Sequence, residues 1–236
     1  RAHALVGGML DARDANMRYL ALDALGTSAD KAHVGRVLAL LRADDESLRS
    51  RALDVVCALS DAHSYAAVLA GVLHALPGAP PAQRRRAAVQ AACMCAEYAA
   101  DRREFTDAVF SLVRRSGAAG ELWLHLARAA DAAYAAECAL ACVRSAPDAA
   151  LVQLAAYVLG EWAAYARCAP REQLALFAPH AHVPQTAGLL LTLYARWLCT
   201  FPELRADLVH AIRAHCASRD AEVQQRACEY AALAEF

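Results

Sequence analysis

Nine histidines are the residues most able to do chemistry, and their spacing argues against a catalytic or metal site. His180-x-His182 lies beside prolines and is expected in a loop, whereas His210 and His215 are five residues apart and face different sides of a predicted helix. The chain has no His-Glu-x-x-His motif and no His-Glu dipeptide, the metal-binding patterns of metalloproteases and of helical-repeat iron hydroxylases. It also has no Gly-x-Ser-x-Gly nucleophile elbow and no phosphate loop. We therefore predict no catalytic, cofactor-binding or metal-binding residue, and no enzyme activity.

Nine cysteines are the second set of reactive side chains. Cys93-x-Cys95 and the pair Cys138 and Cys142 could in principle hold a metal, but the chain has no Cys-x-x-Cys and no second pair at zinc-like spacing. The cysteines stand inside apolar stretches such as VVCAL (55–59) and CALACV (138–143). Free cysteine in such a stretch behaves as a small apolar core residue. We interpret the cysteines as reduced core thiols in a reducing compartment.

Arginine clusters are the third candidate site. Arg84, Arg85 and Arg86 open one predicted helix, and further arginine pairs at 102–103 and 114–115 flank the next. Bunched on one edge, these side chains could meet phosphoinositide headgroups. The favoured alternative is a solvated edge whose charges are balanced by nearby acidic residues at 97, 101 and 104. The net charge of −1 gives no excess that would drive the chain onto nucleic acid.

Short helices must position all of these residues. Of the 236 residues, 61 are alanine, and leucine and arginine, which also favour helices, are frequent. Strand and hairpin signals are scarce. Apolar residues recur at helical spacing, and Asp44 or Asp45, Pro81 and Asp220 mark helix starts. The sequence predicts helices near 14–25, 30–43, 45–60, 62–76, 81–100, 103–116, 119–129, 131–145, 148–166, 170–178, 184–200, 203–217 and 220–234, with a partial helix before residue 11.

The predicted helices repeat one another. Matching alanines at positions 21, 52, 87, 155 and 227 are first 31 and 35 residues apart, and then 68 apart, which is twice 34. A period of this length with two helices per unit is typical of an α-solenoid of antiparallel helix pairs, as in HEAT and armadillo repeats. Asp45 and Asp220 each precede an arginine by six residues, which resembles the Asp–Arg ladder that ties HEAT repeats together. The alternative is a helix cap beside an unrelated surface arginine.

Domain organisation follows from the same repeat. We predict a single α-solenoid domain over residues 1–236, and, because the chain starts at Arg1 without methionine or leader, a fragment of a longer protein. The long uncharged stretches at 62–83 and 173–195 contain histidines and prolines. A membrane-spanning helix needs about 20 mostly apolar residues, so we predict no membrane span.

Several stretches resemble one family, the adaptin large subunits. They occur in the order and spacing of that family and cover nearly the whole chain: NMRYLALDAL (16–25), LRSRALDVVCAL (48–59), AAYVLGEW (155–162), LLLTLYARWLCTFPE (189–203) and VQQRACEYAAL (223–233). The later stretches are most similar to the alpha type, the alpha subunit of the plasma-membrane clathrin adaptor complex. The resemblance implies the C-terminal half of the adaptin trunk, a solenoid of helix pairs.

The resemblance also implies a function. Adaptin trunks are non-catalytic scaffolds that assemble with beta, medium and small adaptin subunits, and the whole complex meets clathrin, cargo and the phosphoinositide membrane. The expected role is therefore in clathrin-mediated endocytosis and vesicle transport, in the cytoplasm and peripherally on the plasma membrane at clathrin-coated pits. The family's best-known lipid and dileucine-cargo contacts lie toward the trunk's N-terminus, so no binding residue is carried over to this chain.

Three alternatives stay open at this point. The chain could belong to a gamma-type large subunit of a Golgi or endosomal adaptor complex. It could be an enzyme on a helical-repeat fold, or a solenoid that binds membranes directly through Arg84 to Arg86. An importin-like armadillo protein is excluded, because Asn16 is the only asparagine and an asparagine ladder needs several.

Overall fold

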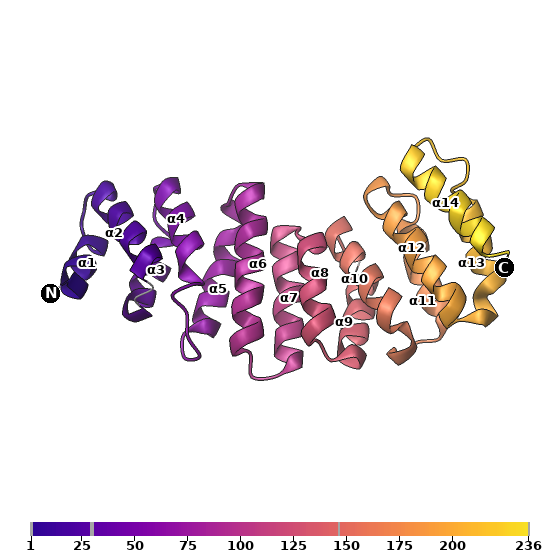
Figure 1. Ribbon diagram of the computed structural model, residues 1–236, viewed down its shortest axis with the longest axis horizontal. Coiled ribbons are helices and arrows are strands. Elements are labelled where there is room, and N and C mark those ends of the chain that lie inside the picture. Colours follow the sequence, from indigo (N-terminus) through magenta and orange to yellow (C-terminus); the bar gives the residue numbers. More distant parts are fainter. Residues whose placement is uncertain (1, 29–30, 146, 236) are drawn as a thin grey trace. The chain divides into compact units, whose positions relative to one another are not determined.

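The computed structural model describes residues 2–28, 31–145 and 147–235, and these residues form helices and no strand (Figure 1). The α-helices are α1 (Ala2–Leu10), α2 (Ala15–Ser28), α3 (Val34–Leu40), α4 (Glu46–Val56), α5 (Tyr65–Ala75), α6 (Pro81–Tyr98), α7 (Arg102–Ser116), α8 (Ala119–Ala129), α9 (Ala132–Arg144), α10 (Ala149–Trp162), α11 (Pro170–Phe177), α12 (Pro184–Thr200), α13 (Arg205–Arg213) and α14 (Ala221–Leu233). Each predicted helix has its counterpart here. The expected start of the 30–43 helix falls on a residue outside the described ranges.

Aspartates start five of these helices. The side chain of Asp45 accepts a hydrogen bond from the backbone N–H of Leu48 at 3.0 Å, which caps the first turn of α4. The residues that precede α7, α9, α10 and α14 cap them in the same way: Asp101, Asp131, Asp148 and Asp220. A capping carboxylate satisfies N–H groups that have no partner inside the helix. Proline, whose missing N–H costs nothing there, opens α6, α11 and α12.

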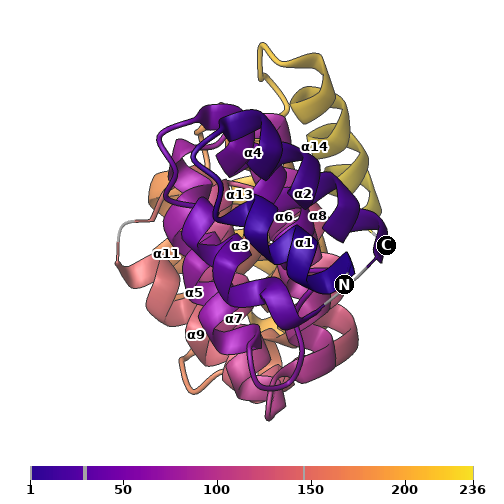
Figure 2. The same cartoon turned by 90° about the vertical axis from the view of Figure 1, so that its left-hand side faces the viewer.

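The helices are grouped in two compact units, Arg1–Ala129 and Ala130–Phe236. Within the first unit, consecutive helices pair as α1–α2, α3–α4, α5–α6 and α7–α8, and the second unit contains the pairs α9–α10 and α13–α14. Figure 2 looks along the first unit, where α3, α5 and α7 form one layer and α2, α4 and α6 form the other. This arrangement confirms the predicted all-α solenoid class. The single domain over residues 1–236 stays a prediction.

Charged side chains link the second helix of one pair to the second helix of the next. Arg51 of α4 lies 2.6 Å from Asp23 of α2 (Nε to Oδ1), and Arg86 of α6 lies 2.5 Å from Asp54 of α4 (Nη2 to Oδ1). In the second unit Arg196 of α12 pairs with Glu161 of α10. Successive ion pairs therefore form a ladder along α2, α4 and α6 of the first unit, and one such pair joins α10 and α12 of the second unit.

This ladder corrects the predicted partners. Asp45 and Asp220 do not pair with arginines of the neighbouring helix pair, because their carboxylates cap α4 and α14. The two arginines of the predicted pattern do reach the preceding helix pair, but through other partners. Arg51 meets Asp23, and Arg226 donates to the carbonyl of Gly188 at 3.1 Å. The spacing within one helix predicted which arginines reach the preceding helix pair. The partners of these arginines depend on which helices lie side by side.

The core of the second unit is built around Trp197 of α12. Its side chain is fully buried, and its indole N–H donates to the carbonyl of Leu159 in α10 at 2.8 Å. The rings of Phe177 and Phe201 meet the indole edge-on, with centroids 6.1 and 5.6 Å away. Edge-on aromatic contacts of this kind add about 0.5–1.5 kcal/mol to the area they bury. Trp197 therefore holds α10, α11 and α12 together.

The cysteines are divided between core and surface. Cys57, Cys95 and Cys142 are buried, as predicted, and burial raises the pKa of Cys57 and of Cys95 to about 12. The prediction is wrong for Cys93, Cys199 and Cys228, which are exposed. In the described parts of the chain, no three His, Cys, Asp or Glu residues are grouped as metal ligands would be. None of the described helices is both long and apolar enough to cross a bilayer.

Candidate functional site

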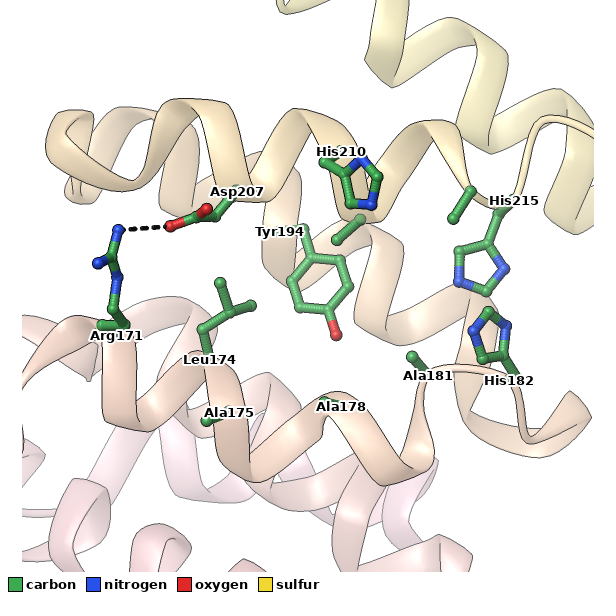
Figure 3. A pocket seen from close by; sticks show the side chains of 12 residues that line it. Arg171, Leu174, Ala175, Ala178, Ala181, His182, Tyr194, Asp207, His210 and His215 are labelled. Atoms are coloured by element: carbon green, nitrogen blue, oxygen red, sulfur yellow. Dashed lines mark hydrogen bonds and ion pairs between the residues drawn. The ribbon is translucent and has the colours of Figure 1, made fainter.

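One hollow of the second unit is a groove of about 580 Å³ between α11 and α13, with α12 behind it (Figure 3). We call it the α11–α13 groove. One wall comes from α11 and the turn that follows it, and the other from α13 and the residues just after its end. Five of the twelve lining residues are alanine: Ala175, Ala178, Ala181, Ala211 and Ala214. The short side chains leave the space between the two helix surfaces unfilled.

Helical spacing places the walls. Arg171, Leu174 and Ala175 are three and four residues apart, so they share one face of α11. Asp207, His210 and Ala211 repeat that spacing on α13. The two faces lie opposite each other across the groove (Figure 3).

A pair of side chains crosses each end of the groove (Figure 3). At one end Arg171 donates to the Asp207 carboxylate at 2.9 Å (Nη2 to Oδ2). At the other end the rings of His182 and His215 lie with their centroids 4.9 Å apart. The ends are therefore marked by side chains that belong to different elements, and the open side of the groove faces solvent.

Tyr194 of α12 forms the floor. Its side chain is 1% exposed, its ring stands between the two walls, and its hydroxyl points into the groove (Figure 3). Burial raises the pKa of Tyr194 to about 12, so the hydroxyl keeps its proton. None of the described residues shares a hydrogen bond with this hydroxyl, which faces the open space of the groove.

His215 is the buried partner of the histidine pair. Only 6% of its surface is exposed, whereas the His182 side chain is exposed. Burial lowers the pKa of His215 below its usual value, and the neighbouring His182 lowers it further. Both effects disfavour a second positive charge at this end of the groove, so His215 is held in the neutral form.

The structure brings together residues that the sequence separated. His210 and His215 do not face opposite sides of one helix, because α13 ends at Arg213 and the chain turns before His215. Both therefore line the groove, and His182 joins them from the turn before α12. His180 ends a short 3-10 turn and is not part of the lining. The sequence signal for the two groove walls is the set of alanines that recur at helical spacing in 171–181 and 207–214.

The arginine cluster at the start of α6 is not a patch of three free charges. Arg86 is exposed but pairs with Asp54, and the Arg84 side chain is half-buried, which leaves Arg85 as the member that is exposed and outside an ion pair. Among the described residues, Arg85 has no ion-pair partner. A lipid surface would therefore meet one unneutralised arginine here, which adds about 1 kcal/mol near an anionic membrane.

The chain is similar throughout to one protein family. The family described as "Adaptin N terminal region" matches residues 2–235. The chain belongs to this adaptin family. The adaptins are adaptor subunits and not catalysts, in agreement with the prediction that the chain is not an enzyme. The observed helix pairs are the fold that the resemblance implied.

Curated relatives of this adaptin chain carry alpha-type names. It is 27% identical to the AP-2 complex subunit alpha-2 of Dictyostelium discoideum, over 96% of this chain and 25% of that protein. It is 25% identical to AP-2 complex subunit alpha-1 of Arabidopsis thaliana, over 98% of this chain and 26% of the relative. The AP-2 complex subunit alpha of Schizosaccharomyces pombe is also 25% identical, over 95% of this chain and 28% of that protein. The adaptin chain spans about a quarter of the length of these relatives.

Proposed function

We propose that this adaptin chain is part of the trunk of an alpha-type large subunit in the plasma-membrane clathrin adaptor complex. The observation that carries the proposal is the similarity to AP-2 alpha subunits of an amoeba, a plant and a yeast over nearly the whole chain. In this role the chain is a non-catalytic scaffold. Its partners are the beta, medium and small adaptin subunits, and clathrin, cargo and phosphoinositide membrane are met through the whole complex.

The repeat architecture supports a scaffold. In a solenoid each helix pair contacts its neighbours in the chain, so much of both layers stays available as surface. Ion pairs such as Arg51–Asp23 and Arg196–Glu161 tie successive pairs together within each unit. A partner subunit can therefore bind across several helix pairs without competing with a single closed core.

The test is assembly of the complex. The protein that contains this chain is tagged and co-expressed with the beta, medium and small adaptins of the same organism, followed by size-exclusion chromatography. We expect one four-chain peak that contains the plasma-membrane type of medium subunit. A peak that contains only the Golgi-type medium subunit would assign the chain to a gamma-type complex instead. Absence of assembly with either set would overturn the scaffold proposal.

The proposed location is the cytoplasmic face of the plasma membrane at clathrin-coated pits, where the complex attaches the chain to the membrane. Imaging of the tagged protein checks this location. We expect spots at the cell surface that coincide with clathrin and disperse when the medium subunit is depleted. Spots that coincide with a Golgi marker would contradict the alpha-type assignment and favour the gamma type.

Direct membrane binding through Arg84 to Arg86 is a separate hypothesis that the ion pair of Arg86 weakens. Its test is flotation of the assembled complex with vesicles that contain phosphoinositide. Arg85→Glu changes the arginine of this cluster that is exposed and has no ion-pair partner among the described residues, and Arg219→Glu is a matched control on an exposed arginine of the second unit. Equal flotation of both variants would remove the hypothesis. A loss of flotation in Arg85→Glu alone would support it.

A further inference from the structure

The hydroxyl of Tyr194 points into the α11–α13 groove and shares no hydrogen bond with any described residue (Figure 3). A ligand in the groove can therefore give this hydroxyl a hydrogen-bond partner. We propose that the groove binds a peptide segment of a partner protein that presents one large apolar side chain beside a carboxylate. This inference rests on the geometry of the second unit alone, so it stands independently of the adaptor complex proposed above.

The size and lining of the groove call for a large apolar side chain. Protein interiors are packed as tightly as organic crystals, yet the alanine walls leave about 580 Å³ open. Ligand pockets have volumes of about 300–1,000 Å³ and mostly apolar walls with a few polar groups. Leu174, Ala178 and Ala211 supply the apolar walls on both sides.

The ends of the groove favour an inserted side chain over a helix that lies along it. Arg171–Asp207 crosses one end and His182–His215 crosses the other (Figure 3). A helix laid along the full length would have to displace both pairs. A single side chain that enters from the solvent side displaces neither, and its backbone can pass over the rim.

The polar groups of the groove favour a hydrogen-bond acceptor. The Tyr194 hydroxyl can donate one hydrogen bond, and the ring nitrogens of His182 and His210 can donate others. Asp207 is the one carboxylate of the lining, and Arg171 already neutralises it. A carboxylate of the partner can accept hydrogen bonds from these donors, including the Tyr194 hydroxyl. Charge-assisted hydrogen bonds of this type are about twice as strong as neutral ones.

A second hollow continues beyond the histidine pair. It has a volume of about 510 Å³, shares His182 and His215 with the α11–α13 groove, and is lined by Arg219. Arg219 is exposed, and among the described residues it has no ion-pair partner. Its neighbour Asp220 is occupied as the cap of α14. A peptide that extends past the histidines therefore meets a further positive charge, which again favours an acidic segment.

The test begins with a display library of random short peptides, selected on the protein that contains this chain. Binding of the enriched peptides is then measured by fluorescence anisotropy. We expect enriched sequences in which a large apolar residue stands next to Asp or Glu. Replacing that acidic residue by its amide should weaken binding by about tenfold, because a charge-assisted hydrogen bond is lost. Enrichment without an acidic residue, or no enrichment at all, would overturn the proposal.

One groove variant and one matched control locate the site. Ala211→Leu fills the groove and should weaken peptide binding by at least about tenfold through a steric clash. Ala206→Leu makes the same change at an exposed position of α13 outside the groove lining and should leave binding unchanged. Equal binding by both variants would place the peptide elsewhere and reject the groove.

Tyr194→Phe separates a ligand-binding role from a structural one. Because the hydroxyl has no partner in the protein, its loss should leave the unfolding midpoint unchanged or slightly raised. Peptide binding should weaken by about fivefold, the value of one neutral hydrogen bond. Unchanged affinity for the peptide would contradict the assigned role of the hydroxyl.

Two other occupants are distinguished in the same experiments. Inorganic phosphate that displaces the labelled peptide and still binds Ala211→Leu would show an anion site rather than a peptide groove. Self-association of the protein that Ala211→Leu abolishes and Ala206→Leu retains would show a second copy as occupant. Either result would overturn the peptide proposal.

Discussion

Two contacts between first helices of neighbouring pairs differ sharply in packing. Between α3 and α5 of the first unit, a β-carbon added at Gly71 would lie 2.7 Å from Leu38 Cδ2 and 3.2 Å from Leu41 Cδ1, so there is no room for one more carbon. Between α11 and α13 of the second unit, alanines on both walls leave a groove of about 580 Å³. The same kind of helix contact is closed in one unit and open in the other.

The difference shows how a repeat fold produces a site. Helix pairs occur in both units, but the volumes of the side chains between neighbouring pairs differ. Leucine side chains fill the space beside Gly71 between α3 and α5, whereas alanines on α11 and α13 leave the space between those helices unfilled. The groove is confined to the surface, because directly behind it Tyr194 and Trp197 of α12 are buried.

The largest expected effect tests whether the core behind the groove is packed as tightly as the contact between α3 and α5 of the first unit. Trp197→Ala removes a fully buried side chain, its hydrogen bond to Leu159 and two aromatic contacts. The free energy of unfolding should fall by about 3–5 kcal/mol, measured by urea unfolding followed by circular dichroism. Leu233→Ala, at a side chain that is 66% exposed, is the control and should change little. A loss for Trp197→Ala as small as that of the control would mean that the open packing extends into the core.

The second prediction breaks the closed contact. Gly71→Val forces two methyl groups against Leu38 and should lower the free energy of unfolding by about 1–3 kcal/mol. Gly35→Val on α3 is the matched control, because a β-carbon there meets nothing within 4 Å. Thermal unfolding of both variants gives the comparison. Equal midpoints would show that α3 and α5 separate easily.

The third prediction concerns the histidine end of the groove. Burial lowers the pKa of His215 in the folded protein, so below its usual value of about 6.5 the unfolded chain binds more protons than the folded chain. Stability is therefore full above that value and falls as the pH drops toward the lowered pKa. The free energy of unfolding is measured across this window. His215→Gln should flatten the pH profile, whereas His63→Gln, at an exposed histidine, should leave it unchanged. An unaltered profile in His215→Gln would contradict the burial of a neutral imidazole.

The fourth prediction compares ion pairs from the two regions. Arg51 and Asp23 side chains are 28% and 46% exposed, whereas Arg171 and Asp207 at the groove are 77% and 47% exposed. Double-mutant cycles with alanine should give about 0.5–1 kcal/mol for the first pair and less for the second, because solvent screens exposed charges. Added salt should reduce both values. A stronger coupling at the groove would mean that its end is rigid without a ligand.

The smallest effect on stability is expected from filling the groove. Ala211→Leu adds three carbons where there is open space, so the free energy of unfolding should change by no more than about 0.5 kcal/mol. Thermal unfolding measures this change. A large loss would show that the groove closes in solution, and the contrast with Gly71→Val would disappear.

The sequence alone determined the helices, their starts and the family. Capping aspartates such as Asp45 and first-turn prolines such as Pro81 act on their own helix, so local spacing is enough to find them. The repeat of alanines near every 34 residues predicted the stacked helix pairs, because each pair needs a neighbour to bury its apolar face.

Only the tertiary structure decided which residues meet. Arg51 has Asp45 six residues away in sequence, but its partner is Asp23 on the preceding helix pair. His182 and His215 are thirty-three positions apart and form one ring contact because the turn before α12 lies beside the end of α13. The hydroxyl of Tyr194 faces open space because the alanines of α11 and α13 do not fill the groove above it. Contacts across helices depend on side-chain volume and on the order of stacking, and no spacing within a single helix contains either.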